Sequence, residues 1–286
     1  MNIDAVLVLD AADIAMRMKS IFMSTKPVNL SFEGKVLQLD QIQGLLKLTT
    51  PDITLNLSEP YLENDTLSLN LPLQFSLKDL RGHLDKAQVG LNRYLINIAG
   101  DIDMPDNGDV NLDLALSTNT LVVEDVLSYL PQKVQERLRG FGFAGKAILS
   151  DIEVKGTYND SLMPLISTKV VTDNMMVNIS QLPYPFTQVN LDGKLELNFN
   201  TEANSFTVNS LSAKFNRSSL TAEGLVDDFL GDVGLKLKVK GDVPMSDIKS
   251  YLPKNLNLQG RTNLDLVTNF TYAQLDKSLN DYNLNR

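Results

Sequence analysis

The chain has 286 residues, a formal net charge of −9 and no cysteine. Its hydrophobic fraction of 43% and charged fraction of 21% are typical of a folded protein and exclude a mainly disordered one. The absence of thiols excludes disulfides, thiolate nucleophiles and cysteine-ligated metals, and the absence of a dense Lys/Arg cluster argues against a nucleic-acid partner.

The first predicted elements are a helical segment and a strand. Apolar residues at the spacing of a short helix lie between Asp13 and Met23. Ile53, Leu55 and Leu57 then alternate with polar residues, which predicts a strand with one apolar face.

The longest alternating run extends from Leu67 to Leu77, where every second residue is apolar. It predicts a strand longer than the usual five or six residues, and Pro72 within it indicates an edge or a bulge. The same pattern predicts strands at 110–116, 195–199, 235–239 and 264–270. Because the intervening residues are polar, the pattern favours an antiparallel sheet with one dry face and one wet face.

Helical spacing is clearest in one segment, where Gly140 supplies a stop. The apolar residues at this spacing are Val123, Val126, Leu127, Leu130, Val134 and Leu138. Pro131 would clash inside a continuous helix, so we expect two short helices or a kink. Pro244–Leu252 is predicted as the equivalent segment further along.

Turn-forming residues separate the predicted strands. The predicted turns are Asp106-Asn107-Gly108, Tyr158-Asn159-Asp160, Asp192-Gly193 and Gly231-Asp232. Gly100 and Gly224 fall inside alternating runs, where glycine indicates a bulge or a tight bend.

An internal repeat relates the two halves of the chain. Asp125–Pro131 recurs as Asp247–Pro253, 122 positions later, with Ser-Tyr-Leu-Pro identical in both. The flanks recur at an offset of 124 and in the same order. The matching blocks are Leu71-x-Leu73-x-Phe75 with Leu195-x-Leu197-x-Phe199, Asn92-Arg93 with Asn216-Arg217, and Gly100 with Gly224.

The repeat predicts units of about 123 residues, each with a short helical segment. The predicted divisions are 1–12 (the end of a preceding repeat), 13–124, 125–246 and 247–286 (the start of a third). We therefore expect this sequence to be a piece of a longer protein.

An apolar sheet face cannot remain in water without cost, and the helical segments are too few and too short to cover so many strands. The predicted fold is therefore mainly β, an elongated antiparallel sheet that curls. The sequence leaves two versions of this fold open. The apolar side chains either form a closed core, or they line an open groove that could bind acyl chains. The candidate lining residues are Leu69, Leu71, Leu73, Phe75, Leu112, Leu114, Leu116, Leu195, Leu197, Phe199, Leu235, Leu237 and Val239.

Several blocks together resemble a known family. An alternating strand is followed by a helix carrying Ser-Tyr-Leu-Pro, a strand with Gly145-Lys146, and Gly156-Thr157-Tyr158 ahead of Leu162-Met163-Pro164 and Tyr184-Pro185-Phe186. This order resembles the AsmA-like family of Gram-negative envelope proteins over most of the chain. The resemblance implies a periplasmic β-rich region, tethered by an inner-membrane anchor that this sequence lacks, and kinship with bridge-like lipid transfer proteins.

The function expected from these observations is non-enzymatic binding and transfer of phospholipid or another acyl-chain lipid along an apolar β-groove. The family resemblance implies a role in outer-membrane assembly or envelope maintenance and contacts with other envelope proteins. The alternative is a structural or interaction β-repeat protein of the envelope whose apolar face is closed.

Catalytic and metal sites have little support, and no cofactor is expected. His83 is the only histidine, and Asp79–Asp85 around it is predicted as a surface turn. Asp101–Asp109 is rich in aspartate but lacks the spacing and final Glu of a calcium loop, so a hairpin turn is favoured.

Overall fold

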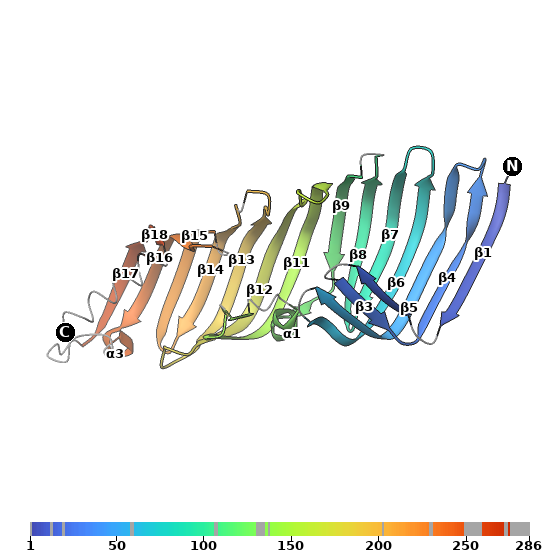
Figure 1. The fold of residues 1–286 in the computed structure, drawn as a ribbon. Coiled ribbons are helices and arrows are strands. Elements are labelled where there is room, and N and C mark those ends of the chain that lie inside the picture. Colours follow the sequence, from blue (N-terminus) through green and yellow to red (C-terminus); the bar gives the residue numbers. More distant parts are fainter. Residues whose placement is uncertain are drawn as a thin grey trace. The chain divides into compact units, whose positions relative to one another are not determined.

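The computed structural model of the protein describes residues 2–11, 14–18, 21–57, 60–105, 108–129, 135–136, 138–201, 203–228, 231–248, 259–271 and 274 (Figure 1). It contains two compact units. Unit 1 comprises Met1–Asn119 and Ser150–Leu165, and unit 2 comprises Thr120–Leu149 and Ile166–Arg286.

Unit 1 is an open antiparallel sheet. Its strands are β1 (Asn2–Ala11), β2 (Ile14–Met18), β3 (Ile21–Thr25), β4 (Val28–Leu37), β5 (Gln41–Leu57), β6 (Pro60–Ser76), β7 (Arg81–Leu91), β8 (Tyr94–Asp103) and β9 (Val110–Thr118). From β4 to β9 each strand pairs with the next, β1 pairs with β4, and β9 pairs with the end of β11 (Phe141–Tyr158). Long strands joined by short turns follow from the alternating sequence.

Unit 2 has the same kind of sheet. Its elements are β10 (Leu121–Val122), α1 (Val123–Ser128), the first part of β11, β12 (Leu165–Ile179), β13 (Phe186–Leu197), β14 (Ser205–Phe215), β15 (Ser218–Asp227), β16 (Gly234–Pro244), α3 (Met245–Ile248), β17 (Arg261–Val267) and β18 (Phe270–Thr271). Neighbouring strands from β12 to β17 pair in sequence order, and β18 also pairs with β16. The predicted mainly β, antiparallel fold is confirmed, and the sheet is not closed.

The register gathers the apolar residues of each unit on one face of the sheet, because residues directly opposite in an antiparallel pair share a face. In unit 1, Phe32 lies opposite Leu46, and Leu46 lies opposite Leu71. In unit 2, Leu195 lies opposite Phe206, which lies opposite Val226. Each unit therefore has one apolar face and one polar face.

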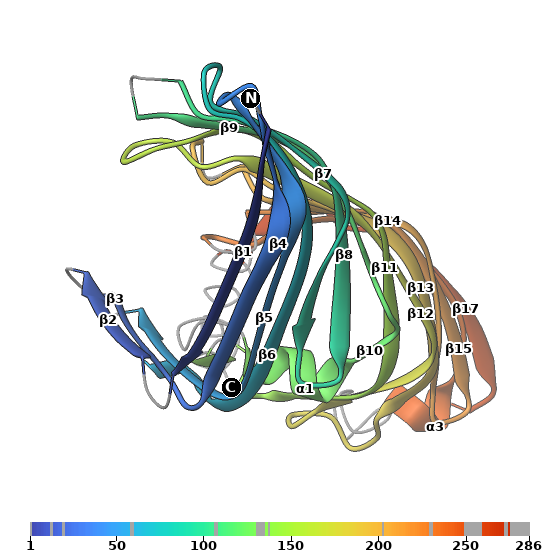
Figure 2. The same ribbon diagram turned by 90° about the vertical axis from the view of Figure 1, so that its right-hand side faces the viewer.

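The apolar face of unit 1 lies on the inside of a bend. β5 pairs with β4 up to Thr49 and with β3 from Ile53 onward, so the strand turns from one neighbour to another between these residues. Val28 and Thr50 are each only 1% exposed at this bend. Val28 continues the alternation of β4, which places the apolar face on the concave side of the curved strands (Figure 2).

The core of unit 2 forms on its apolar face, where helix α1 packs. Met175, Val189 and Ala213 are buried there, and Val123 at the start of α1 contacts them. Figure 2 shows α1 on the inside of the curved strands. The apolar face of unit 2 is therefore also its concave face.

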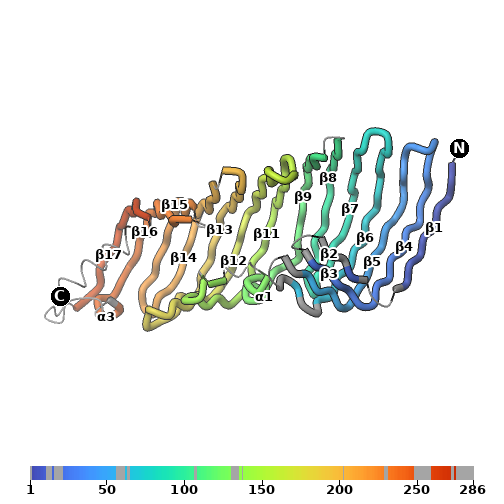
Figure 3. Tube along the Cα trace, viewed as in Figure 1, coloured from blue at the N-terminus to red at the C-terminus, as the bar shows by residue number. Residues whose placement is uncertain are grey.

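The predicted helix at Asp13–Met23 is wrong. β2 and β3 form a hairpin instead, with Met16 opposite Met23 (Figure 3). Ile14, Met16 and Met18 also occupy every second position, so this segment fits a strand as well as a helix. Pairing of β3 with β5 decides between them.

The later helical predictions are confirmed in part. α1 covers only the first turn and a half of the predicted segment, and Pro131 lies outside the described residues. Pro244 ends β16, and α3 begins at the next residue. The rest of Pro244–Leu252 beyond Ile248 lies outside the described residues.

The predicted turn at Asp192-Gly193 is also wrong, because both residues lie inside β13. A Cβ on Gly193 would lie 2.6 Å from Cζ of Phe206 on the neighbouring strand. This glycine is therefore required by the close approach of an aromatic ring rather than by a turn.

The predicted bulges at Gly100 and Gly224 are confirmed, and they recur. Gly100 (φ +134°) lies opposite Leu84, beside a register shift in β7, and Gly224 (φ +142°) lies opposite Val208, beside a register shift in β14. A Cβ at either position would lie 2.1 Å from a backbone oxygen of the next strand. Pro72 faces the same shift in β7, as predicted from its place in the run.

The hairpin asparagines ahead of these glycines match as well. Asn92 has φ 50° and Asn216 has φ 51°, at the same offset of 124 residues. The two halves therefore share local conformations at corresponding positions, while the predicted unit boundaries stay predictions.

Candidate functional site

The candidate lining residues of unit 1 lie together on its concave face. Leu69, Leu71, Leu73 and Phe75 project from β6, and Leu112, Leu114 and Leu116 project from β9. The register carries the face from one strand to the other, since Leu69 lies opposite Val89, Val89 opposite Ile96, and Ile96 opposite the end of β9.

In unit 2 the structure brings together five of the six candidates. Leu195 and Leu197 lie on β13, and Leu235, Leu237 and Val239 lie on β16, all on the concave face. Phe199 lies beyond the end of β13 and is 42% exposed, so no strand pairing places it on this face.

None of the thirteen candidates is buried. Twelve are half-buried and Phe199 is exposed. In a closed core, a second layer of the protein would cover the leucines at the centre of a long strand and bury them. Within the described part of each unit, no such layer covers them, so the closed version of the fold is not the one that forms.

The concave faces contain further apolar residues that the sequence analysis did not select. In unit 1 these include Leu30, Phe32, Ile42, Leu46, Leu48, Val89, Ile96, Ile98, Ile102 and Val154. In unit 2 they include Val170, Leu191, Phe206, Val208, Leu220 and Val226. The period-two pattern was present in β4 and β8 and could have identified them, whereas the bulges in β7 and β14 hide the pattern by shifting it one residue.

Aromatic rings fill the gaps that glycines leave in these faces. A Cβ on Gly34 or Gly44 would lie 2.6 or 2.7 Å from the ring of Phe32. Phe206 lies over Gly193 in the same way. Each ring therefore covers bare backbone that would otherwise face the groove.

Charged side chains are confined to the opposite, polar faces of the described strands β4–β9 and β12–β16, apart from the bulges. On the polar faces, exposed groups of opposite charge form ion pairs within a strand and between neighbouring strands. Lys155 Nζ lies 3.1 Å from Glu153 and 3.7 Å from Asp113, and Lys236 Nζ lies 2.7 Å from Asp227. The hydrogen bond from Lys155 to Glu153, with the charges of Glu153 and Asp113, raises the pKa of Lys155. Such exposed pairs stabilise a protein little, so their main effect is to keep one face wet.

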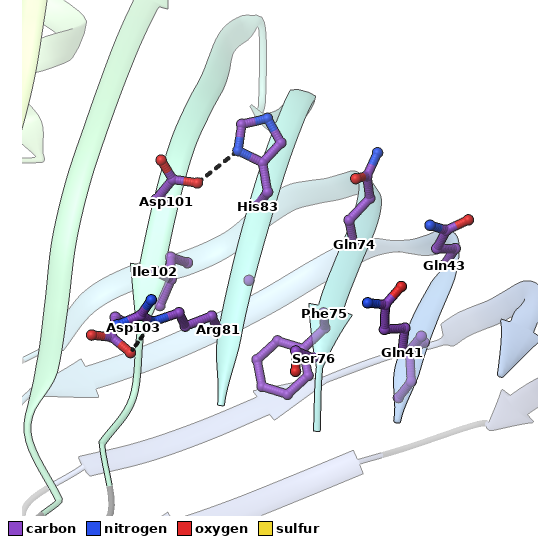
Figure 4. A pocket seen from close by; sticks show the side chains of 12 residues that line it. Gln41, Gln43, Gln74, Phe75, Ser76, Arg81, His83, Asp101, Ile102 and Asp103 are labelled. Carbon is purple, nitrogen blue, oxygen red and sulfur yellow. Dashed lines mark hydrogen bonds and ion pairs between the residues drawn. The ribbon is translucent and has the colours of Figure 1, made fainter. Parts of the chain in front are cut away.

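Two depressions on the sheet lie on the polar faces. In unit 1 a depression of about 490 Å³ runs between two rows of polar side chains on β5–β8 (Figure 4). One row contains Gln43, Gln74, His83 and Asp101, and the other contains Gln41, Ser76, Arg81 and Asp103. A similar depression of about 510 Å³ in unit 2 is lined by polar residues of β13–β16, including Asn190, Glu223 and Lys238.

His83 is exposed, as expected, but it lies inside β7 and not in the turn that precedes it. Its Nδ1 is 2.7 Å from Oδ1 of Asp101. The geometry is that of a surface hydrogen bond between neighbouring strands.

The aspartate-rich segment 101–109 connects β8 to β9, in line with the favoured hairpin turn, and residues 106–107 lie outside the described part. Among the described residues no group of His, Asp and Glu is arranged to hold a metal ion. No described helix is long and apolar enough to span a membrane.

One buried charge fixes helix α3 to the sheet of unit 2. The Asp247 side chain is 0% exposed and accepts hydrogen bonds from Asn216 Nδ2 (2.8 Å), the Arg217 backbone N–H (3.0 Å) and Ser218 Oγ (2.9 Å). Burial opposes ionisation of Asp247, but these hydrogen bonds outweigh it and hold the pKa below its ordinary value. The repeated Asp of the helical segment is therefore a structural anchor in this unit.

Fold and site together define an open, antiparallel β-sheet protein with uncovered apolar concave faces. No protein-family model, curated protein or solved structure matches the chain. The function must therefore be argued from the faces themselves.

Proposed function

We propose that the concave faces bind the acyl chains of phospholipids or other lipids and pass them along without catalysis. The observation that carries the proposal is that twelve apolar side chains, spaced along strands in both units, stay half-buried with no protein layer over them in the part of the chain that the structure describes. Soluble monomers rarely leave contiguous apolar surface of this kind without a partner.

The energetics suit an acyl chain. Each methylene removed from water contributes about 0.8 kcal/mol, so covering even half of a long chain offsets much of the cost of extracting it from a membrane. Leu, Val, Ile and Phe side chains shield methylenes from water without making directional contacts. On the described strands β4–β9 and β12–β16, no charged group outside the bulges points from these faces, so few groups there would fix a lipid at one place.

The cellular setting is also a proposal, and it rests on the AsmA-like resemblance. We place the protein in the periplasm, tethered to the inner membrane by an anchor outside this sequence, where it serves outer-membrane assembly or envelope maintenance together with other envelope proteins.

Displacement of a fluorescent fatty acid tests the proposal. Leu114→Asn places an amide on the concave face of β9, and Ala115→Asn places the same amide on the opposite, exposed face of the same strand. We expect Leu114→Asn to weaken binding about tenfold, which corresponds to roughly 1.4 kcal/mol and to less apolar contact, while Ala115→Asn binds like the wild type.

Mass spectrometry of the gently purified protein provides an independent reading. Co-purifying lipid supports the proposal. A clean apo mass, together with no uptake of the fluorescent fatty acid by the wild type, would rule it out.

The second candidate is an interaction role among envelope proteins. The closed core that this alternative assumed is not formed, because the sheet is not closed.

A further inference from the structure

One border of the unit 1 sheet includes three strand connections whose residues the structure describes in full. They are residues 38–40 between β4 and β5, 77–80 between β6 and β7, and 159–164 between β11 and β12. The register places these strand ends level with one another, and Figure 1 shows the connections β4–β5 and β6–β7 along the same border. We call these three connections the rim of unit 1.

Each connection of the rim presents a leucine to solvent. Leu39, Leu77 and Leu162 are 62%, 44% and 41% exposed. At the other end of β4 and of β7, the connections are Lys26-Pro27 and Asn92-Arg93, which contain no leucine. The exposed leucines therefore mark one border of unit 1 and are not a general property of its strand connections.

The turns themselves do not require these leucines. Leu39 has φ 59°, a left-handed conformation that glycine and asparagine adopt more readily than leucine. Turn positions usually carry Gly, Asn, Asp, Ser or Pro, because these residues suit the backbone of a turn. A leucine that is both exposed and unfavourable for its turn breaks a local rule, and such positions are commonly functional.

Hydrogen bonds fix the backbone of the rim. The carbonyl oxygen of Asp40 accepts one from the Leu77 N–H (2.7 Å), and Oδ1 of Asp40 accepts another from the Lys78 N–H (2.8 Å). Oδ1 of Asn159 accepts one from the Leu162 N–H (2.8 Å). Well-defined connections therefore hold these leucines out into solvent.

The rim continues the apolar concave face of unit 1. Leu77 is the next member of the alternating row of β6 after Phe75. At the end of β11, Tyr158 lies opposite Val110, two residues before Leu112 on the concave side of β9, and Tyr158 is 49% exposed. The apolar surface therefore extends from the concave face to the border of the sheet at both places.

We infer that the rim of unit 1 inserts its exposed leucines into the surface of a lipid bilayer. The inference rests on the proposed function, since it names the surface from which acyl chains would enter the concave face. Because β8 and β9 lie between the β6–β7 and β11–β12 connections, the leucines stand well apart. Separate side chains suit a fluid bilayer surface better than the close packing of a protein interface, and an exposed tyrosine is favourable at the same depth.

The charges of the rim select the kind of bilayer. The three connections contain Asp40, Asp79 and Asp160 but only one basic residue, Lys78. An anionic bilayer would repel this border, because its surface potential has the same sign. The partner is therefore a zwitterionic lipid surface.

Co-flotation with phosphatidylcholine vesicles tests the contact. The wild type should float with the vesicles, and Leu39→Ser and Leu162→Ser should each lower the partition coefficient about tenfold, because each removes one aliphatic side chain from the bilayer. Leu95→Ser is the matched control, since Leu95 on β8 is 38% exposed but lies at the end of the strand away from the rim. Replacing part of the phosphatidylcholine by phosphatidylglycerol should weaken flotation of the wild type, and salt should restore it.

A polarity-sensitive fluorophore locates the contact on the molecule, because the natural chain has no cysteine that would compete for the label. Attached to Lys78→Cys on the rim, the label should brighten and shift to shorter wavelength when vesicles are added. Attached to Arg93→Cys at the opposite strand ends, it should not change. Equal responses at the two positions would overturn the inference.

Fatty-acid displacement without vesicles separates this inference from the proposed function. Leu39→Ser and Leu162→Ser should take up the fluorescent fatty acid like the wild type, because the concave face is intact. A wild type that takes up the fatty acid but does not float with vesicles would overturn the inference and leave the proposed function standing. Flotation that both rim variants lose, without fatty-acid uptake by the wild type, would support the membrane contact and overturn acyl-chain binding instead. A dimer that Leu39→Ser dissociates in sedimentation equilibrium, without flotation of the wild type, would assign the rim to a protein contact and overturn the inference.

Discussion

Removing the Asp247 carboxylate tests whether a single buried charge fixes helix α3 to unit 2. Asp247→Ala deletes the acceptor of three hydrogen bonds of 2.8 to 3.0 Å. A hydrogen bond to a charged group contributes about 1.5–3 kcal/mol, but the donors do not lose it equally. Asn216 and Arg217 are exposed and can turn to water, whereas Ser218 is only 2% exposed.

We therefore expect the free energy of unfolding to fall by about 2–4 kcal/mol. This is the cost of leaving the buried Ser218 hydroxyl without an acceptor, plus smaller losses at Asn216 and Arg217, and it is less than the sum of three full hydrogen bonds. Urea denaturation followed by far-UV circular dichroism measures it in the transition of unit 2. Asp242→Ala is the matched control, because Asp242 also pairs with an arginine, Arg261 at 2.7 Å, but on the exposed surface. We expect no measurable change for it.

The same carboxylate predicts a pH dependence. Because the folded state lowers the pKa of Asp247, its contribution to stability is complete above the unfolded pKa of about 3.9 and is lost as the pH falls through the lower folded pKa. Asp247→Asn should lack this component, so its stability should fall less steeply below about pH 4 than that of the wild type. Equal urea midpoints for wild type and Asp247→Ala, or parallel pH profiles for wild type and Asp247→Asn, would refute the reasoning.

Two further substitutions test the packing of the concave faces. Gly193→Ala should destabilise unit 2 by about 1–3 kcal/mol because the new methyl meets the Phe206 ring, while Gly142→Ala, whose Cβ would have its nearest contact at 3.5 Å, should be neutral in the same urea titration. Val28→Ala should cost unit 1 about 2 kcal/mol because Val28 is fully enclosed at the bend of β5, and Leu30→Ala on the same strand, where the side chain is half-buried, should cost less per methylene removed in thermal unfolding. A Val28→Ala loss per methylene removed that is smaller than that of Leu30→Ala would contradict the position of the bend.

The sequence predicted the fold class because one physical signal dominated it. In β6 and β9 the leucines occupy every second position without interruption, and both segments form the strands expected. Gly100, Gly224 and Pro72 were also interpreted correctly, because few other backbone arrangements require these residues within a strand.

The errors arose where two local patterns compete and a distant partner decides. Ile14, Met16 and Met18 satisfy both a helical and a strand pattern, and only the pairing of β3 with β5 selects the strand. Asp192-Gly193 has the composition of a turn, and the reason for the glycine is Phe206, thirteen residues away. The candidate site was incomplete for a similar reason, since the bulges of β7 and β14 move apolar residues out of phase.

The single-layer construction has a consequence for how unit 1 comes apart. Within the described part of unit 1 no second layer lies over the sheet, and β1 is held by its ladder to β4, whereas β6 has ladders on both sides. Loss of structure should therefore begin at the margin and move inward strand by strand, as a zipper opens from its end. Amide hydrogens would then exchange with solvent soonest in β1 and latest in β5 and β6, and a lesion at the margin would leave the interior of the ladder intact.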